Sequence, residues 1–162
     1  MILLFDVGNT NIVMGIVEDN KIVNTYRFIT NASMTEDEYY SKFQSVIGSS
    51  NIDGIAISSV VPLVDNTLVT MSKKYFNITP LIVGPGVKSG VKIKIENPKQ
   101  LGADLLCDAV GAKIYFKETC VIVDLEKDMI HGIVDYKLDK EVYLSIFLYI
   151  EEFFGVVWYN FS

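Results

Sequence analysis

Cysteine, histidine and basic side chains are scarce in this sequence. Its 162 residues contain two cysteines and one histidine, and 14 lysines and arginines stand against 20 aspartates and glutamates, for a net charge of −6. Cys107 and Cys120 lack CxxC and Cys/His spacing, so we expect buried thiols in a reducing cytoplasm and no zinc site. With His131 as the single histidine, Ser-His-Asp and Cys-His mechanisms are disfavoured. The acidic balance argues against nucleic acid as a partner.

Long uncharged hydrophobic runs are absent as well. The longest candidate, Val142–Phe161, is interrupted at its centre by Glu151 and Glu152, so we predict no membrane span. The N-terminus has no signal-peptide pattern, which favours the cytoplasm. Half of the residues are hydrophobic and 21% are charged, which predicts a buried core and excludes wholesale disorder. The length fits one domain, or one complete domain and part of another.

Short apolar runs between turn-forming residues predict an α/β fold. The first three runs are joined by short turns, which favours an antiparallel three-stranded meander at the start of a mixed sheet with covering helices. Thr35 before three acidic residues predicts a helix N-cap. The predicted strands are Ile2–Phe5, Ile12–Val17, Ile22–Ile29, Ile52–Ser58, Leu81–Val83 and Cys120–Val123. The predicted helices cover residues 36–47, Val64–Tyr75 and Pro98–Phe116.

The turn after the first predicted strand carries the residues best suited to chemistry. Gly8 lets a backbone approach a ligand closely, and Asn9 and Thr10 add short hydrogen-bond donors. A tight turn with several available N–H groups can bind phosphate oxygens, and Asp6 at the strand end can hold Mg²⁺. A β-hairpin in which Gly8 and Asn9 merely accommodate positive φ is the structural alternative.

Five segments over residues 1–124, in the right order and spacing, resemble the type III pantothenate kinases of the actin, sugar-kinase and heat-shock ATPase superfamily. The turn just described lies in the first of them. The segments are Asp6–Val13 (DVGNTNIV), Ser58–Pro62 (SSVVP), Gly84–Gly90 (GPGVKSG), Asn97-Pro98-Lys99 with Gly102-Ala103-Asp104, and Val121–Asp124 (VIVD).

This resemblance implies a fold, an activity and its small molecules. The implied fold is ribonuclease-H-like α/β, with residues 1–117 as an N-terminal ATPase-like domain and residues 118–162 as the start of a second domain. The implied activity is ATP-dependent phosphorylation of pantothenate to 4′-phosphopantothenate, the first step of coenzyme A synthesis. The implied cofactors are ATP, Mg²⁺ and a monovalent cation (K⁺ or NH₄⁺). Family members are homodimers.

The resemblance also implies roles for individual residues. Asp104 would be the general base that takes the proton from the pantothenate hydroxyl, with Gly102, Ala103 and Leu105 beside the substrate. Asp6 and Asp104 would therefore face one cleft. The residues implied to contact ATP are Asp6, Val7, Gly8, Asn9, Thr10, Asn11, Ile12 and Val13.

Two metal ligands are implied as well. Asp6 would hold Mg²⁺, and Asp124 would hold the monovalent cation. The residues themselves leave alternatives open, because Asp104 also fits a helix-surface carboxylate and Asp124 a strand-end cap.

The sequence departs from the family pattern at two places. Leu105 stands where the family has Arg, and a leucine cannot donate a hydrogen bond to an anion. Glu126 and Lys127 follow Asp124 where the family has a Gly-Thr-Ala-Thr phosphate loop, and a glutamate repels a triphosphate unless a metal intervenes.

The segment after Asp124 has a different composition. Residues 125–162 hold nine of the 19 aromatic residues and −4 of the net charge. We hypothesise a truncated or frame-shifted ending without the second domain and its dimer surface, and a tail helix packed on the exposed sheet face. We then expect impaired turnover. The alternatives are a non-catalytic remnant and an accessory or regulatory protein of the same fold.

Overall fold

The computed structural model describes residues 1–116, 120–122 and 132–134. The chain divides into two compact units, Met1–Val83 and Gly84–Ser162. The domain boundary expected at residues 117–118 falls beside the undescribed residues 117–119 and stays a prediction.

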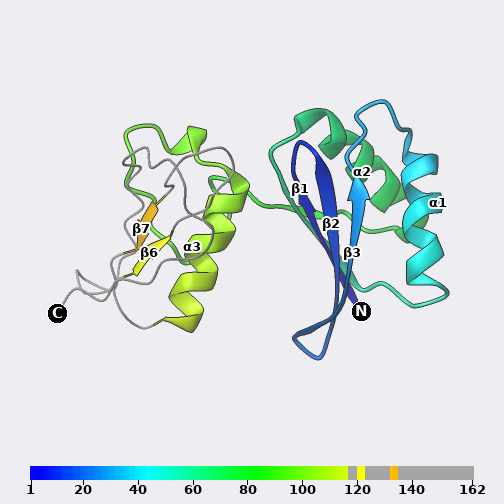
Figure 1. The fold of residues 1–162 in the computed structure, drawn as a ribbon, viewed down its shortest axis with the longest axis horizontal. Helices are drawn as coiled ribbons and strands as arrows, with labels where there is room; N and C mark the ends of the chain where they lie inside the picture. The colour runs from blue at the N-terminus through cyan, green and yellow to red at the C-terminus, as the bar shows by residue number, and fades with distance from the viewer. Residues whose placement is uncertain (117–119, 123–131, 135–162) are drawn as a thin grey trace. The chain divides into compact units, whose positions relative to one another are not determined.

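The first unit contains a five-stranded mixed sheet with the order β3-β2-β1-β4-β5 (Figure 1). The first three strands pair antiparallel, and β4 and β5 continue the sheet in parallel with β1. The predicted meander and the mixed α/β sheet are therefore confirmed, with strand ends displaced by one or two residues. The strands are β1 (Ile2–Val7), β2 (Asn11–Glu18), β3 (Lys21–Ile29), β4 (Gly54–Ser59) and β5 (Leu81–Ile82).

Helices α1 (Glu36–Ile47) and α2 (Pro62–Phe76) share one hydrophobic core with the sheet. Alternate residues of β1 are buried in this core, which is the period-two pattern of a strand covered on one face. Phe43 of α1 lies at its centre, with ring centroids 4.9 Å from Phe5 and 5.0 Å from Phe28. This packing fixes the strand ends that are described below.

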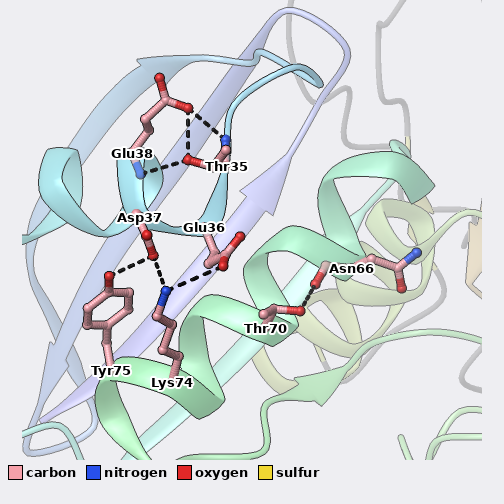
Figure 2. Close-up of polar contacts among 8 residues, drawn as sticks. All are labelled: Thr35, Glu36, Asp37, Glu38, Asn66, Thr70, Lys74 and Tyr75. Atoms are coloured by element: carbon pink, nitrogen blue, oxygen red, sulfur yellow. Dashed lines mark hydrogen bonds and ion pairs between the residues drawn. The ribbon is translucent and has the colours of Figure 1, made fainter.

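The start of α1 has the predicted N-cap (Figure 2). The Thr35 hydroxyl accepts a hydrogen bond from the Glu38 backbone N–H at 3.3 Å, and the Thr35 N–H donates to the Glu38 carboxylate at 2.8 Å. These reciprocal bonds form a capping box, which satisfies two N–H groups that a helix start otherwise leaves unpaired. The hydrogen bonds from Thr35 also lower the pKa of the Glu38 carboxyl.

A polar and aromatic cluster joins α1 to α2 (Figure 2). Lys74 forms ion pairs with Asp37 and Glu36, and the Tyr75 hydroxyl donates to Asp37 at 2.7 Å. The Tyr75 ring stacks on Tyr40 with centroids 3.7 Å apart. The hydrogen bond from Lys74 lowers the pKa of Asp37, with a second contribution from Tyr75, and the bond to Asp37 raises the pKa of Lys74. Because these groups are exposed, they add little stability each.

In its described residues, the second unit contains one short and one longer helix beside a strand pair. The short 3₁₀ helix η1 covers Pro98–Gln100 and α3 covers Ala103–Tyr115. Strands β6 (Cys120–Ile122) and β7 (Gly132–Val134) pair antiparallel, and α3 packs beside them. The sequence analysis did not predict β7.

Two predictions about this unit are wrong. The single helix predicted over Pro98–Phe116 is broken, because Leu101 and Gly102 adopt extended backbone angles and Leu101 is buried. The Cys107 side chain is exposed, since α3 turns its other side, with Leu106 and Ala109, to the interior.

Within the described ranges, no helix combines the length and apolarity of a membrane span. The predicted tail helix lies outside the described residues.

Candidate functional site

Several strand ends of the first unit meet at one edge of its sheet. The parallel strands β1 and β4 end there at Val7 and Ser59, and a hydrogen bond from the Val60 N–H to the Val7 carbonyl (3.0 Å) extends their pairing. The antiparallel strand β3 ends at the same edge, opposite the first residue of β2. Ligands of open α/β sheets bind beyond the carboxyl ends of the strands, so this edge is the first place to look for a site.

The turn from β1 to β2 is held in shape by its own carbonyl groups. The Gly8 N–H donates to the Asn11 carbonyl at 2.9 Å. Thr30, just after β3, donates its hydroxyl to the Gly8 carbonyl at 2.7 Å and its N–H to the Thr10 carbonyl at 2.9 Å. Within the described part of the chain, no hydrogen bond takes up the N–H groups of Asn9 and Thr10. Three carbonyl groups of the turn, those of Gly8, Thr10 and Asn11, are therefore occupied, while two of its N–H groups are available to a ligand.

The eight residues predicted to contact ATP lie on both faces of the sheet and in the turn between β1 and β2. Val7 and Ile12 are buried in the core beneath the helices, so only their backbone is available for a ligand. Their neighbours Asp6 and Val13 face the opposite side of the sheet, where Asp6 is exposed and Val13 is half-buried. The four turn residues that remain are exposed or half-buried: Gly8, Asn9, Thr10 and Asn11.

Asp6 provides the one carboxylate among these eight residues. It lies in register between Val13 of β2 and Ser58 of β4. Among the described residues, no group of three His, Cys, Asp or Glu side chains forms a metal cage. Mg²⁺ usually binds through one or two carboxylates, water and substrate phosphates, so Asp6 beside a turn with available N–H groups fits this ion without such a cage.

In the second unit, Asp104 lies in the first turn of α3. It is half-buried, and its Oδ1 accepts a hydrogen bond from the Leu105 N–H at 2.8 Å. Gly102 is the N-cap and has no side chain to cap the helix. A Cβ atom on Gly102 would collide with Oδ1 of Asp104, so the carboxylate occupies space that only a glycine leaves open.

The other predicted substrate residues contribute mainly through packing. The side chains of Ala103 and Leu105 are buried, which attaches the start of α3 to the interior of the unit. Position 105 therefore offers a packed side chain in place of an anion-binding one. The Lys113 ammonium group, further along α3, donates to the carbonyl of Gly90 and so ties the preceding loop to this helix.

Three predictions about the site remain open. Asp6 belongs to the first unit and Asp104 to the second, and the expectation that they share a cleft stays a prediction. Asp124 lies outside the described residues, as do Glu126 and Lys127, so the cation site and the altered phosphate loop stay predictions too.

Sequence reasoning gave no role to two residues at the sheet edge, Thr30 and Ser58. Thr30 holds the turn although it is 22 residues from Gly8 in the chain. Ser58 neighbours Asp6 on the adjacent strand. Ser58 was noted only as the start of the family-like segment Ser58–Pro62, and Thr30 showed only a small hydroxyl residue at the end of a strand, which is too common to identify a site without the strand pairing.

Comparison with protein families gives one match over most of the chain. The model of the family described as type III pantothenate kinase matches residues 2–126. This range includes the turn after β1 and the start of α3.

Two curated relatives are similar to the chain. A type III pantothenate kinase of Halalkalibacterium halodurans is 45% identical over 129 residues, covering 76% of this chain and 51% of the relative. A type III pantothenate kinase of an Exiguobacterium species is 40% identical over 142 residues, covering 85% of this chain and 56% of the relative. Residues 1–126 make up less than 85% of the chain. The match to the Exiguobacterium protein therefore extends past Glu126. The chain spans about half the length of these relatives.

Proposed function

The chain belongs to the type III pantothenate kinase family, and we propose on this basis that it phosphorylates pantothenate to 4′-phosphopantothenate with ATP, in the cytoplasm. This would be the first step of coenzyme A synthesis. The observation that carries the proposal is the turn Gly8–Asn11. The carbonyl groups of Gly8, Thr10 and Asn11 accept hydrogen bonds there, while the N–H groups of Asn9 and Thr10 have no partner in the described part of the chain and can bind phosphate oxygens. The two relatives named above support the choice of substrate.

In the proposed reaction, the chain positions reactants more than it reacts with them. The turn binds the ATP phosphates through its N–H groups, and Thr30 keeps it in that shape. The carboxylate of Asp104 accepts the proton of the pantothenate hydroxyl. The hydroxyl oxygen then bonds to the γ-phosphorus as the bond from that phosphorus to the β,γ-bridging oxygen breaks, and ADP leaves.

Two cations complete the proposal. Mg²⁺ bound to the phosphates neutralises charge that develops in phosphoryl transfer. Asp6 would hold it, because its carboxylate is an exposed hard oxygen donor at the end of the parallel strands β1 and β4. The family resemblance suggests Asp124 for a monovalent cation.

Pantothenate-dependent ADP release by the purified 162-residue chain tests the proposal. We expect slow release, because the buried Leu105 cannot donate a hydrogen bond to an anion where the family has Arg. Asp104→Asn should lower the remaining rate at least about 100-fold, since a positioned general base contributes about 10²–10⁴ in rate. Thr70→Asn, on the exposed surface of α2, is the control that should keep the rate.

A non-catalytic remnant is the second candidate, and the buried Leu105 favours it, because leucine cannot donate a hydrogen bond to an anion where the family has Arg. It predicts MgATP binding without ADP release. Release that continues unchanged in Asp104→Asn would contradict the role of that carboxylate.

A further inference from the structure

Two serines are buried among the described residues, and they differ in one respect. Ser72 of α2 is fully buried, and its hydroxyl donates to the Leu68 carbonyl at 2.7 Å. Ser58 of β4 is 8% exposed, and its hydroxyl has no hydrogen-bond partner within the described part of the chain. Buried hydroxyl groups are almost always paired, because an unpaired one keeps the cost of losing its water.

The other buried polar atom without a partner has a local explanation that Ser58 lacks. Oδ1 of Asp65 lies in the first turn of α2, where the helix macrodipole favours a negative charge. Ser58 lies in a strand, where no comparable field acts. The Ser58 hydroxyl is therefore suited to a partner that the described residues do not supply.

The position of Ser58 indicates which group this is. Ser58 pairs in parallel register with Asp6 of β1. Phe5 and Ile57, the preceding pair in the register, are buried in the core, so Asp6 and Ser58 share the opposite face of the sheet. Neighbouring strands are about 4.8 Å apart, which places an exposed carboxylate and an unpaired hydroxyl side by side.

We propose that the Ser58 hydroxyl binds a water molecule of the hydrated Mg²⁺ that Asp6 holds together with the ATP phosphates. A carboxylate only accepts hydrogen bonds, whereas a hydroxyl accepts and donates, so the pair can anchor waters in either orientation. Mg²⁺ keeps several of its waters when it binds to proteins. This inference rests on the proposed function, because it requires the nucleotide at the same edge.

Calorimetric titration of the full chain with ATP, in Mg²⁺ and separately in a chelator, tests the inference. Ser58→Ala should weaken binding of MgATP about fivefold to tenfold, the effect of one hydrogen bond to a water molecule. Its binding of metal-free ATP should change less than about twofold, since that measurement lacks the hydrated ion. Ser58→Cys, which keeps the side-chain size but hydrogen-bonds weakly, should show the same selective loss.

Ser72→Ala is the matched control. It should leave both affinities unchanged and lower the melting temperature by about 2–4 °C, because it removes a satisfied hydrogen bond. Ser58→Ala should not lower the melting temperature of the ligand-free chain, since it removes an unpaired group.

Each contrary result has its own meaning. Unchanged MgATP affinity in Ser58→Ala overturns the inference while the proposed function stands. An equal loss with and without Mg²⁺ also overturns it, because the hydroxyl would then contact the nucleotide itself. If the unsubstituted chain binds no MgATP, the proposed function fails and the role of Ser58 fails with it.

Discussion

Helices α1 and α3 begin in opposite ways. At α1, the side chains of Thr35 and Glu38 return to the backbone and satisfy two N–H groups of the helix start. At α3, Gly102 has no side chain, and the Asp104 carboxylate occupies the space that a side chain would fill. The first start is arranged for stability. The second leaves a half-buried carboxylate in a position that depends on its glycine neighbour, and this is the carboxylate proposed above as the general base.

Among the substitutions that test this difference between the two helix starts, we expect the largest loss of activity at Gly102. Gly102→Ala forces Oδ1 of Asp104 to move, and only the flexible end of that side chain has to yield. Because displacing a reacting group by about 1 Å can cost 100-fold, we expect pantothenate-dependent ADP release to fall about 10- to 100-fold with little change in melting temperature. Gly111→Ala, inside α3 with no neighbouring atom near its Cβ, is the control. Full activity in Gly102→Ala would show that the rate does not depend on the position of the Asp104 carboxylate.

The next largest effect, on the affinity for MgATP, is expected at Thr30, and Thr70 serves as its control. Both hydroxyls donate to a backbone carbonyl, Thr30 to Gly8 in the turn and Thr70 to Asn66 within α2 (Figure 2). Thr30→Val should weaken MgATP binding about fivefold, as the loss of one hydrogen bond predicts, whereas Thr30→Ser should restore it. Thr70→Val should leave binding unchanged in the same titration. Equal effects of the two valine variants would show that the turn does not depend on Thr30.

A smaller effect is expected at the start of α1. Thr35→Ala removes the capping box and should lower the free energy of unfolding by about 1 kcal/mol, measured by urea denaturation. The MgATP affinity of the folded chain should not change, since the cap lies outside the proposed site. Reduced affinity at unchanged stability would contradict the assignment of this helix start to stability alone.

The smallest effect concerns the cluster between α1 and α2. The folded chain holds the pKa of Asp37 below its ordinary value, chiefly through Lys74. The contribution of this carboxyl to stability is therefore present at neutral pH and is lost as the pH falls through its lowered pKa. Melting temperatures of the unsubstituted chain and Asp37→Asn should differ slightly at about pH 7 and converge at about pH 2–3. A difference that grows on acidification would contradict this sign.

Local features of this molecule were predictable, and features that join distant segments were not. The capping box at Thr35 involves side chains three residues apart. The alternate burial along β1 depends only on the residues of that strand. The break before α3 depends on burial of Leu101, which a proline-led helix pattern does not reveal.

The candidate site follows the same rule. Asp6 and the turn were noted from their residue types, and the resemblance to a family favoured a site there and added Asp104. Roles for Thr30 and Ser58 became visible only when β3 and β4 were placed beside the turn and β1. The pairing of strands decides which hydroxyl groups face a ligand, and pairing is a property of the whole sheet.

The central claim is that the turn after β1 binds the phosphates of ATP. Amide NMR of the ¹⁵N-labelled chain, titrated with MgATP, tests it most directly. We predict that the largest shifts occur at Gly8, Asn9, Thr10 and Asn11, with those of Thr35 to Glu38 unchanged. Saturable binding without a shift of the four turn amide signals, or no binding at all, would contradict the claim.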